Sequence, residues 1–148
     1  MSNFIINLDY LRSWNAIFKI LQLALGTICV GIIGHEFNNT LMYSSSSASF
    51  FLISTTTFYI GTFILFISYL LSPSAASIIP KTIYELVYHA IASLFLFSGS
   101  VAMMVYIHKF EVKGSYYKAE LAASICCLLN TCLYICSAVM GFSTYGDD

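Results

Sequence analysis

Four long apolar runs dominate this chain, at about 15–34, 48–71, 83–108 and 118–142. Each holds roughly 20 residues or more with few charges, enough for a helix to cross a hydrocarbon core about 30 Å thick. Only 9% of all residues are charged, whereas a soluble domain carries about 25%. The sequence therefore predicts an all-α fold: a four-helix transmembrane bundle with short connectors and no soluble domain.

The residues outside these runs are too few to fold separately. Connectors of about 10 to 14 residues cannot build a hydrophobic core, so we interpret 1–148 as a single membrane domain. The formal net charge of −1 provides no field that would attract nucleic acid. Because the first run is too long for a cleavable signal peptide and no Ala-x-Ala-like site follows it, we expect it to remain as a signal anchor.

The cysteines all fall inside the expected spans, so they predict no disulfide framework in the loops. We interpret them as small buried hydrophobic residues. The Cys126–Cys127 pair lies too deep in its helix for palmitoylation, which favours juxtamembrane cysteines. The full set is Cys29, Cys126, Cys127, Cys132 and Cys136.

Local signals mark where the spans begin and end. Thr82 and Glu85 have the spacing of a capping box, which predicts the start of the third span. The Ser72-Pro73 step discourages continuation of the second span. The serine run at 44–47 and the Lys-Gly-Ser sequence at 113–115 predict loops.

The segment before the first span shows weak amphipathic character. Phe4, Leu8 and Leu11 recur at helical spacing, which predicts an interfacial lead-in helix. Tyr10 and Trp14 belong to the same segment, and such amphipathic rings favour the membrane–water interface. We therefore expect this segment to lie along the membrane surface.

Charge alone does not orient the chain. With both termini cytosolic, the inner side has Arg12, Lys19 and Lys81, and the outer side has Lys109, Lys113 and Lys118. The positive-inside rule compares these numbers, and they are equal. The sequon at Asn38 favours an outer first connector, although its closeness to the span end disfavours efficient glycosylation.

Small and polar residues mark the inward faces of the helices, because membrane helices associate through close packing and hydrogen bonds. At 100° per residue, each span aligns one such face. The faces contain Asn15, Lys19, Gln22, Gly26 and Cys29; then Ser54, Thr57, Gly61 and Ser68; then Glu85, His89, Ala92, Ser93, Ser100 and Met103; and finally Ala119, Ala122, Ala123, Cys126, Asn130, Ser137 and Gly141. The packing positions that we single out are Gly26, Gly61, Ser93, Ser100, Ala119, Ala123, Cys126, Ser137 and Gly141.

The ionisable and amide side chains on these faces form the candidate site. A charge inside a membrane is costly, so it faces a partner or water. Lys19 and Glu85 lie about one turn inside the same membrane surface, and we expect them to approach one another, with Gln22 and His89 a turn deeper. The alternatives are an end-of-bundle polar clamp, a proton or ion site, and a Lys19 that extends to the headgroups. Asn130 is interpreted as an interhelical hydrogen-bonding residue.

The sequence carries no recognisable catalytic or metal motif. It has no Gly-x-Ser-x-Gly, His-Glu-x-x-His or phosphate-binding glycine loop. A zinc site needs three or four convergent ligands, and no second histidine lies at the depth of His89. We expect neither cofactor nor metal, and no enzymatic activity.

Two stretches resemble proteins of the MARVEL-domain family. The stretch LRSWNAIFKILQLALG at 11–26 resembles the family's first helix, which commonly opens with a basic residue and continues as a Leu/Ile-rich run with a polar residue and a glycine. The stretch KTIYELVYHA at 81–90 resembles the third span, where an acidic residue precedes aromatic and small residues. The likeness extends over nearly the whole chain, including span number and short connectors.

The resemblance implies a four-helix protein of the plasma membrane or of vesicles, with cytosolic termini. Family members such as the myelin-and-lymphocyte proteins, the physins and occludin work in vesicle trafficking, membrane apposition and fusion, and cell junctions. The leading hypothesis is a non-enzymatic membrane organiser whose partners are the lipid bilayer, other membrane proteins and further copies of itself. A small oligomeric channel or transporter subunit, and an accessory subunit of a larger membrane complex, are the alternatives.

Overall fold

The computed structural model describes residues 6–39, 45–109 and 115–146. Within these ranges four helices are long and apolar enough to cross a membrane: α2 (Trp14–Asn39), α3 (Ser46–Leu71), α5 (Ile83–Lys109) and α6 (Ser115–Thr144). The shorter helices are α1 (Leu8–Leu11), α4 (Pro73–Ile78) and η2 (Ile79–Lys81). The all-α, four-span prediction is confirmed, and each helix reaches or exceeds its predicted bounds.

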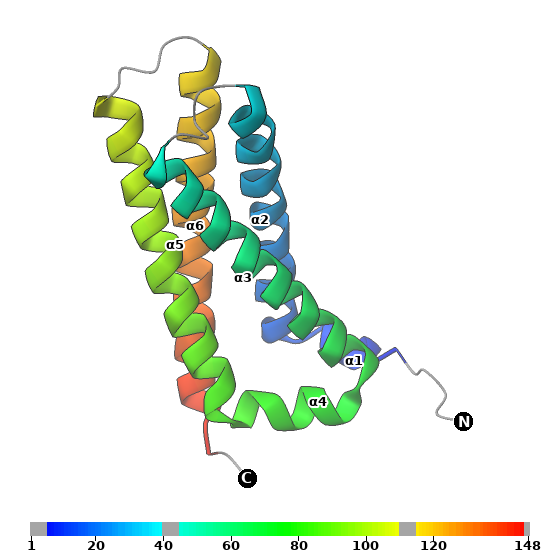
Figure 1. Cartoon of the computed structure of the whole chain (residues 1–148). Coiled ribbons are helices and arrows are strands. Elements are labelled where there is room, and N and C mark those ends of the chain that lie inside the picture. Colours follow the sequence, from blue (N-terminus) through cyan, green and yellow to red (C-terminus); the bar gives the residue numbers. More distant parts are fainter. Residues whose placement is uncertain (1–5, 40–44, 110–114, 147–148) are drawn as a thin grey trace.

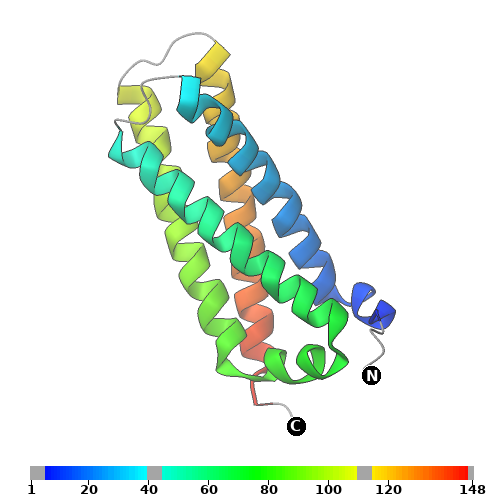
Figure 2. The same cartoon turned by 45° about the vertical axis from the view of Figure 1, so that its right-hand side comes forward.

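The four spans form one bundle. Helix α6 packs against α5 and α2, and α3 packs against α2 and α5. Toward the end of the bundle that carries both termini, α3 diverges from α5, and α4 runs across between them (Figures 1 and 2). This end is termed the terminal end, and the opposite one the loop end.

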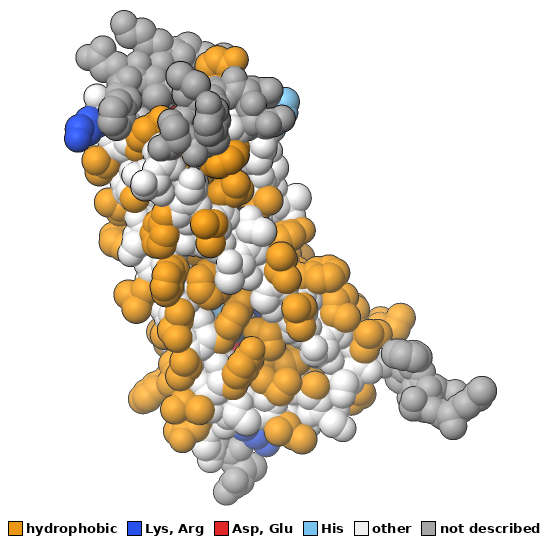
Figure 3. All heavy atoms as spheres, in the orientation of Figure 1, with side chains coloured by type: hydrophobic (Ala, Val, Ile, Leu, Met, Phe, Trp, Pro, Cys, Tyr) orange, Lys and Arg blue, Asp and Glu red, His pale blue; other side chains and the backbone are white. Residues whose placement is uncertain are grey.

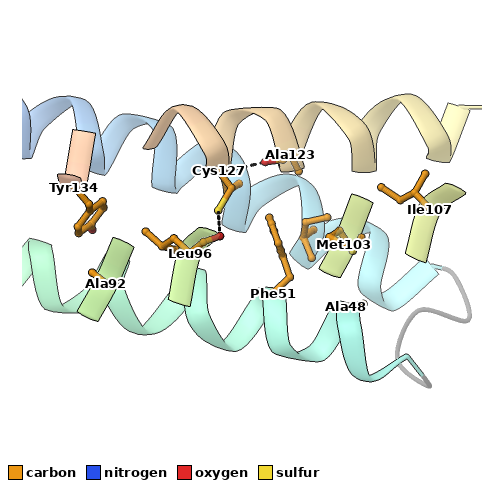
Figure 4. Packing of buried hydrophobic residues seen from close by; sticks show 11 residues of the cluster. Ala48, Phe51, Ala92, Leu96, Met103, Ile107, Ala123, Cys127 and Tyr134 are labelled. Atoms are coloured by element: carbon orange, nitrogen blue, oxygen red, sulfur yellow. Dashed lines mark hydrogen bonds between the residues drawn. The ribbon is translucent and has the colours of Figure 1, made fainter. Parts of the chain in front are cut away.

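The hydrophobic core fills the bundle from its middle to the loop end. Ile33 of α2, Phe51 of α3, and Met103 and Ile107 of α5 are fully buried in it. Figure 4 shows these side chains of α3 and α5 lying between the helices, with Tyr134 of α6 at the inner limit of the cluster. A smaller cluster at the terminal end consists of Tyr10, Ala16, Leu65 and Tyr69.

The outward surface of the spans is apolar. Large exposed side chains include Ile28 on α2, Ile53 and Ile64 on α3, Phe97 on α5 and Val139 on α6. Figure 3 shows hydrophobic side chains along the whole visible length of the bundle. Such a surface suits lipid, and polar groups within the spans must then find partners inside the bundle.

The connector between α3 and α5 is helical, a feature not predicted from the sequence. Ser72 ends α3, as the Ser72-Pro73 step predicts, but its hydroxyl also accepts from Ala75 N at 3.2 Å and so caps α4. Pro73 then occupies the first turn of α4, where its missing N–H costs nothing. One dipeptide therefore stops one helix and starts the next.

Within the described residues before α2, 6–13, the chain forms one helical turn, α1. Asn7 caps α1 by accepting from Tyr10 N at 3.2 Å. Leu8 is exposed and Leu11 half-buried, whereas Phe4 lies outside the described residues. Tyr10 is buried instead of marking the surface, because its ring packs edge-on against Tyr69.

The predicted capping box at the start of α5 does not form. Thr82 donates both its hydroxyl and its backbone N–H to Ile79 O, at 2.7 and 3.0 Å. The backbone N–H of Thr82, which would donate to the Glu85 carboxylate in a capping box, is thus already paired with Ile79 O. Glu85 turns toward α2 and α3 instead. The predicted helix start at Ile83 nevertheless agrees with the structure.

The serine run before α3 is partly helical. Ser45 is the N-cap and accepts from Ala48 N at 3.4 Å, so Ser46 and Ser47 belong to the first turn rather than to a loop. Serine favours N-caps because its hydroxyl satisfies an otherwise unpaired N–H. Of the loop predicted at 113–115, residues 113 and 114 lie outside the described residues, and α6 begins at Ser115.

Candidate functional site

A buried ion pair joins α2 to α5 near the terminal end. Lys19 Nζ lies 2.5 Å from Glu85 Oε1, and the two side chains are 0% and 3% exposed. Asn15 accepts from the ammonium and donates from Nδ2 to Glu85 Oε1 at 3.1 Å. Tyr69 of α3 donates to Glu85 Oε2 at 2.6 Å, and its ring centroid lies 5.0 Å from Lys19 Nζ. Asn15, Lys19, Tyr69 and Glu85 are termed the polar cluster.

The polar cluster satisfies both oxygens of the carboxylate. A charge removed from water is tolerated only with a well-placed partner and further hydrogen bonds, and Glu85 has both. Lys19 and Glu85 were predicted to lie about one turn inside the same membrane surface, and the structure brings them into contact. Tyr69 is missing from the predicted site for two reasons. A tyrosine near the end of a span is typical of the membrane interface, and its hydrogen-bond partner, Glu85, lies on another helix.

Gln22 and His89 form a second layer, one turn deeper. Gln22 donates from Nε2 to Ser137 Oγ at 2.8 Å and to Leu133 O at 3.2 Å, which ties α2 to α6. His89 Nδ1 lies 2.8 Å from Glu85 O, within its own helix. Both side chains are buried, so they lie in the bundle interior, as their positions in the sequence predict.

Hydroxyl groups tie α3 to α5 and α6 at mid-bundle. Thr62 of α3 bonds to Tyr88 of α5 at 3.1 Å and to Tyr134 of α6, and both tyrosines donate to Phe58 O at 3.1 Å. The predicted site omits these residues. Tyr134 lies deep in an apolar run, where a phenol needs an acceptor, and that position is the signal that could have identified it.

Asn130 is buried but forms no hydrogen bond with the polar cluster. Its Oδ1 has no partner among the described residues, and the same holds for Gln22 Oε1 and His89 Nε2. Unpartnered buried polar atoms are uncommon in folded proteins. The structure therefore brings Lys19 and Glu85 together and places Gln22 and His89 in the next layer, but it leaves Asn130 apart.

The predicted packing glycines lie at close helix contacts. A Cβ at Gly141 would lie 3.2 Å from Leu86 N, so α6 reaches the backbone of α5 there. A Cβ at Gly26 would lie 2.8 Å from the Tyr59 ring, and one at Gly61 would lie 2.5 Å from the Tyr88 hydroxyl. Of the other packing positions, Ser100, Ala123 and Ser137 are buried, whereas Ser93, Ala119 and Cys126 are half-buried.

Some residues that the sequence places on inward faces point outward. Thr57 is exposed because its hydroxyl donates to Ile53 O at 2.7 Å within its own helix and needs no other partner. The buried face of α3 keeps the predicted Ser54 and adds Phe51, Thr55, Thr62 and Tyr69. Ala122 of α6 is also exposed.

The expectation of buried cysteines holds only in part. All five are free thiols, and Cys29 and Cys127 are buried, where they donate weakly to Ala123 O and Leu96 O. Cys126 is half-buried, whereas Cys132 and Cys136 are exposed on α6. A thiol is apolar enough to face lipid, which explains why the last two need no buried position.

Glu120 is a buried acid that the predicted site omits. It lies in the first turns of α6, is 1% exposed, and neither of its carboxylate oxygens has a hydrogen-bond partner among the described residues. Its charge interacts with that of Glu36 on α2. The signal that could have identified it is an acidic residue just inside the fourth apolar run.

A cavity of about 490 Å³ opens at the terminal end and reaches the polar cluster. Helices α1, α4 and η2 supply walls, together with the first turns of α2 and α5 and the last turns of α6. Its lining includes Asn7, Asp9, Tyr10, Ser13, Trp14, Asn15, Pro73, Ala76, Ser77, Pro80, Glu85, Ser137, Met140, Gly141 and Thr144. This space is termed the terminal cavity.

Tyr10 lines the terminal cavity from α1. Its hydroxyl is buried and has no hydrogen-bond partner among the residues that the structure describes. Burial, together with the nearby charge of Glu85, raises the pKa of the Tyr10 phenol above its usual range. The phenol therefore stays protonated over a wider pH range than a free tyrosine, and its oxygen keeps an unused lone pair.

Within the described part of the chain, no three His, Cys, Asp or Glu side chains gather as metal ligands would. Asn38 lies in the last turn of α2, and its side chain lies outside what the structure describes. Its glycosylation stays a prediction.

Comparison with known proteins agrees with the helix arrangement. A family model, MARVEL, described as a membrane-associating domain, matches residues 10–140. No curated protein and no solved structure matched the chain. The family match covers well over half of the sequence, with the first three spans, the fourth span as far as residue 140, and the polar cluster inside it. The chain therefore belongs to the MARVEL family and is an integral, multi-pass membrane protein.

Proposed function

We propose that this protein is a non-enzymatic organiser of membrane patches, acting in vesicle trafficking, membrane apposition or junction assembly. The MARVEL family is in general membrane-organising and non-enzymatic, which supports this proposal. Its mechanism is lateral: the bundle binds other membrane helices and lipids and thereby gathers them. We also propose that both termini, which lie at the same end of the bundle (Figure 1), face the cytosol.

The observation that carries the proposal is the division between interior and surface. The polar cluster and the second layer, Gln22 and His89, hold α2, α3, α5 and α6 to one another. The outer surface of the bundle is therefore left for lateral contacts. One groove on that surface, about 270 Å³ between α5 and α6, is lined by Leu86, Ala90, Ser93, Ile135, Ala138, Val139 and Phe142. Small residues such as Ala90, Ser93 and Ala138 permit a neighbouring helix to approach closely.

The packing of the core argues against conduction through a single bundle. Ile33, Phe51, Met103 and Ile107 are fully buried between the polar cluster and the loop end. An ion that entered the terminal cavity would meet these closely packed apolar side chains before it reached the loop end. A channel would therefore require several copies.

Proximity labelling of the full-length chain in cells tests the proposal. We expect enrichment of multi-pass membrane proteins from one compartment, and partial loss of these neighbours with Ala138→Phe, which fills the groove. Ile64→Phe adds a ring at an exposed position of α3 and serves as the matched control. Labelling that returned only soluble metabolic enzymes, or the same neighbours for both variants, would contradict the proposal. Tags on each terminus test compartment and orientation.

A further inference from the structure

The terminal cavity lies at the depth of the lipid headgroups. Helices α2 and α5 begin there and α3 and α6 end there, so it marks the level at which the chain leaves the hydrocarbon (Figures 1 and 2). Trp14, 71% exposed at the cavity's edge, is the residue type that favours this interface. A volume of about 490 Å³ is within the usual range of small-ligand sites.

The charges that line the terminal cavity favour a cation. Asp9 and Glu85 contribute carboxylates, and none of the described lining residues is Lys, Arg or His. Glu85 is already paired with Lys19. Asp9 is exposed on α1 and forms no ion pair with any residue that the structure describes, so its charge is available to a ligand.

Aromatic groups complete the lining on the same side. Tyr10 and Trp14 flank the segment that carries Asp9, and aromatic faces attract ammonium groups, including quaternary ones. The buried Tyr10 hydroxyl, which lacks a partner among the described residues, can accept a hydrogen bond from a primary ammonium. A carboxylate, two aromatic rings and a vacant acceptor together match an organic ammonium group.

We propose that the terminal cavity binds the organic ammonium group of a phospholipid headgroup, phosphoethanolamine or phosphocholine, with Asp9 as counter-ion. Tyr10 and Trp14 contact the ammonium group, and Asn15 and Glu85 form the inner wall. This inference rests on the proposed function, because it names the lipid class that the organiser gathers. Free ethanolamine and choline share the same chemistry, and the experiment separates them from lipids.

Trp14 is the single tryptophan of the chain, so its fluorescence reports directly on the cavity. The purified full chain in maltoside micelles is titrated with dihexanoyl lipids that differ only in headgroup. We expect a saturable change with the ethanolamine and choline headgroups and none with the glycerol headgroup. Free ethanolamine and choline form a third arm: binding equal to that of the lipids assigns a soluble source, and weaker binding assigns the lipid.

Variants locate the binding. Asp9→Asn should weaken it about tenfold, the loss expected for one charge-assisted contact, and Asp9→Glu should restore it. Tyr10→Phe should weaken binding of the ethanolamine headgroup more than binding of the choline headgroup, because only a primary ammonium can donate to the Tyr10 hydroxyl. Tyr84→Phe is the matched control, since Tyr84 is exposed at the same end and does not line the cavity.

Equal binding of the glycerol headgroup, or unchanged binding by Asp9→Asn, would overturn the proposal. Displacement by tetramethylammonium but not by dimethyl phosphate, measured on the unmodified chain, tests it without relying on the folding of any variant. Loss of headgroup binding leaves the neighbours recruited at the α5–α6 groove unaffected. The two proposals therefore fail separately.

Discussion

At the scale of single residues, the Lys19–Glu85 pair illustrates how a membrane protein tolerates charge. The pair carries no net charge, and Asn15 and Tyr69 satisfy its remaining lone pairs and protons. A buried pair of this kind is costly to break by removing one partner and cheap to replace as a whole. We therefore expect the pair to specify how α2, α3 and α5 meet more than to raise stability.

Glu85→Gln should lower the free energy of unfolding by about 3–5 kcal/mol, because it leaves the Lys19 ammonium buried without a counter-ion. The double variant Lys19→Met/Glu85→Gln should recover most of this loss. Detergent-denaturation curves of the two single variants and the double variant form a double-mutant cycle. Additive losses would show that the pair is not coupled.

Tyr134→Phe removes the hydroxyl by which α6 is bonded to Thr62 and to Phe58 O, both on α3. Interhelical hydrogen bonds in membranes contribute about 0.6 kcal/mol on average and rarely more than 2, so a loss of about 1 kcal/mol is expected. Thermal unfolding in micelles measures it. Tyr116→Phe, at an exposed position of α6, is the control and should unfold like the unmodified chain.

At the scale of helices, Gly141 determines how closely α6 approaches α5. A Cβ there would lie 3.2 and 3.3 Å from the N and Cα of Leu86, and backbone atoms cannot move aside as a side chain can. Where the neighbour is a flexible side chain, as Tyr59 is for Gly26, a small substitution is easier to accommodate. The contact of Gly141 with α5 is thus less tolerant of an added side chain than the contact of Gly26 with Tyr59.

Gly141→Ala should destabilise the bundle by about 1–3 kcal/mol through overpacking. Gly34→Ala is the matched control, because nothing lies within 4 Å of its added Cβ. That control should be neutral or stabilising, since alanine favours a helix by up to about 1 kcal/mol over glycine. Equal stabilities of the two variants in the same denaturation assay would show that the α5–α6 contact is loose.

At the scale of the whole molecule, the polar and apolar halves of the interior have different consequences. The terminal half holds the cavity and the polar cluster, and the loop half holds the apolar core (Figure 4), with Glu120 buried near the start of α6. Water is therefore expected to reach the polar cluster from the terminal end only.

Liposomes that contain the purified chain should remain sealed to ions, because Ile33, Phe51, Met103 and Ile107 fill the loop half. Release of a trapped ion-sensitive dye, compared with empty liposomes, measures this. Protein-dependent, saturable flux that Glu85→Gln abolishes would favour the channel hypothesis instead.

The sequence by itself determined the four spans and their approximate positions. Lipid offers no partner to backbone N–H and C=O groups, so a run of about 20 apolar residues has little choice but a helix. It also determined the common depth of Lys19 and Glu85, because depth follows from position along a span. The resemblance to the MARVEL family is visible in the stretches at 11–26 and 81–90 and in the number of spans, and the family match over residues 10–140 confirms it.

Only the tertiary structure decided which way each helix turns and what encloses the terminal cavity. Both faces of a membrane helix are apolar, so the hydrophobic periodicity that orients a helix in a soluble protein is weak here. The sequence therefore predicted Thr57 on the inward face of α3, whereas Thr57 is exposed and Thr62 and Tyr69 are buried. The partners of Tyr69 and Tyr134 come from other helices. The cavity exists because α1 and α4 fold across the end of the bundle, and no local sequence signal carries that contact.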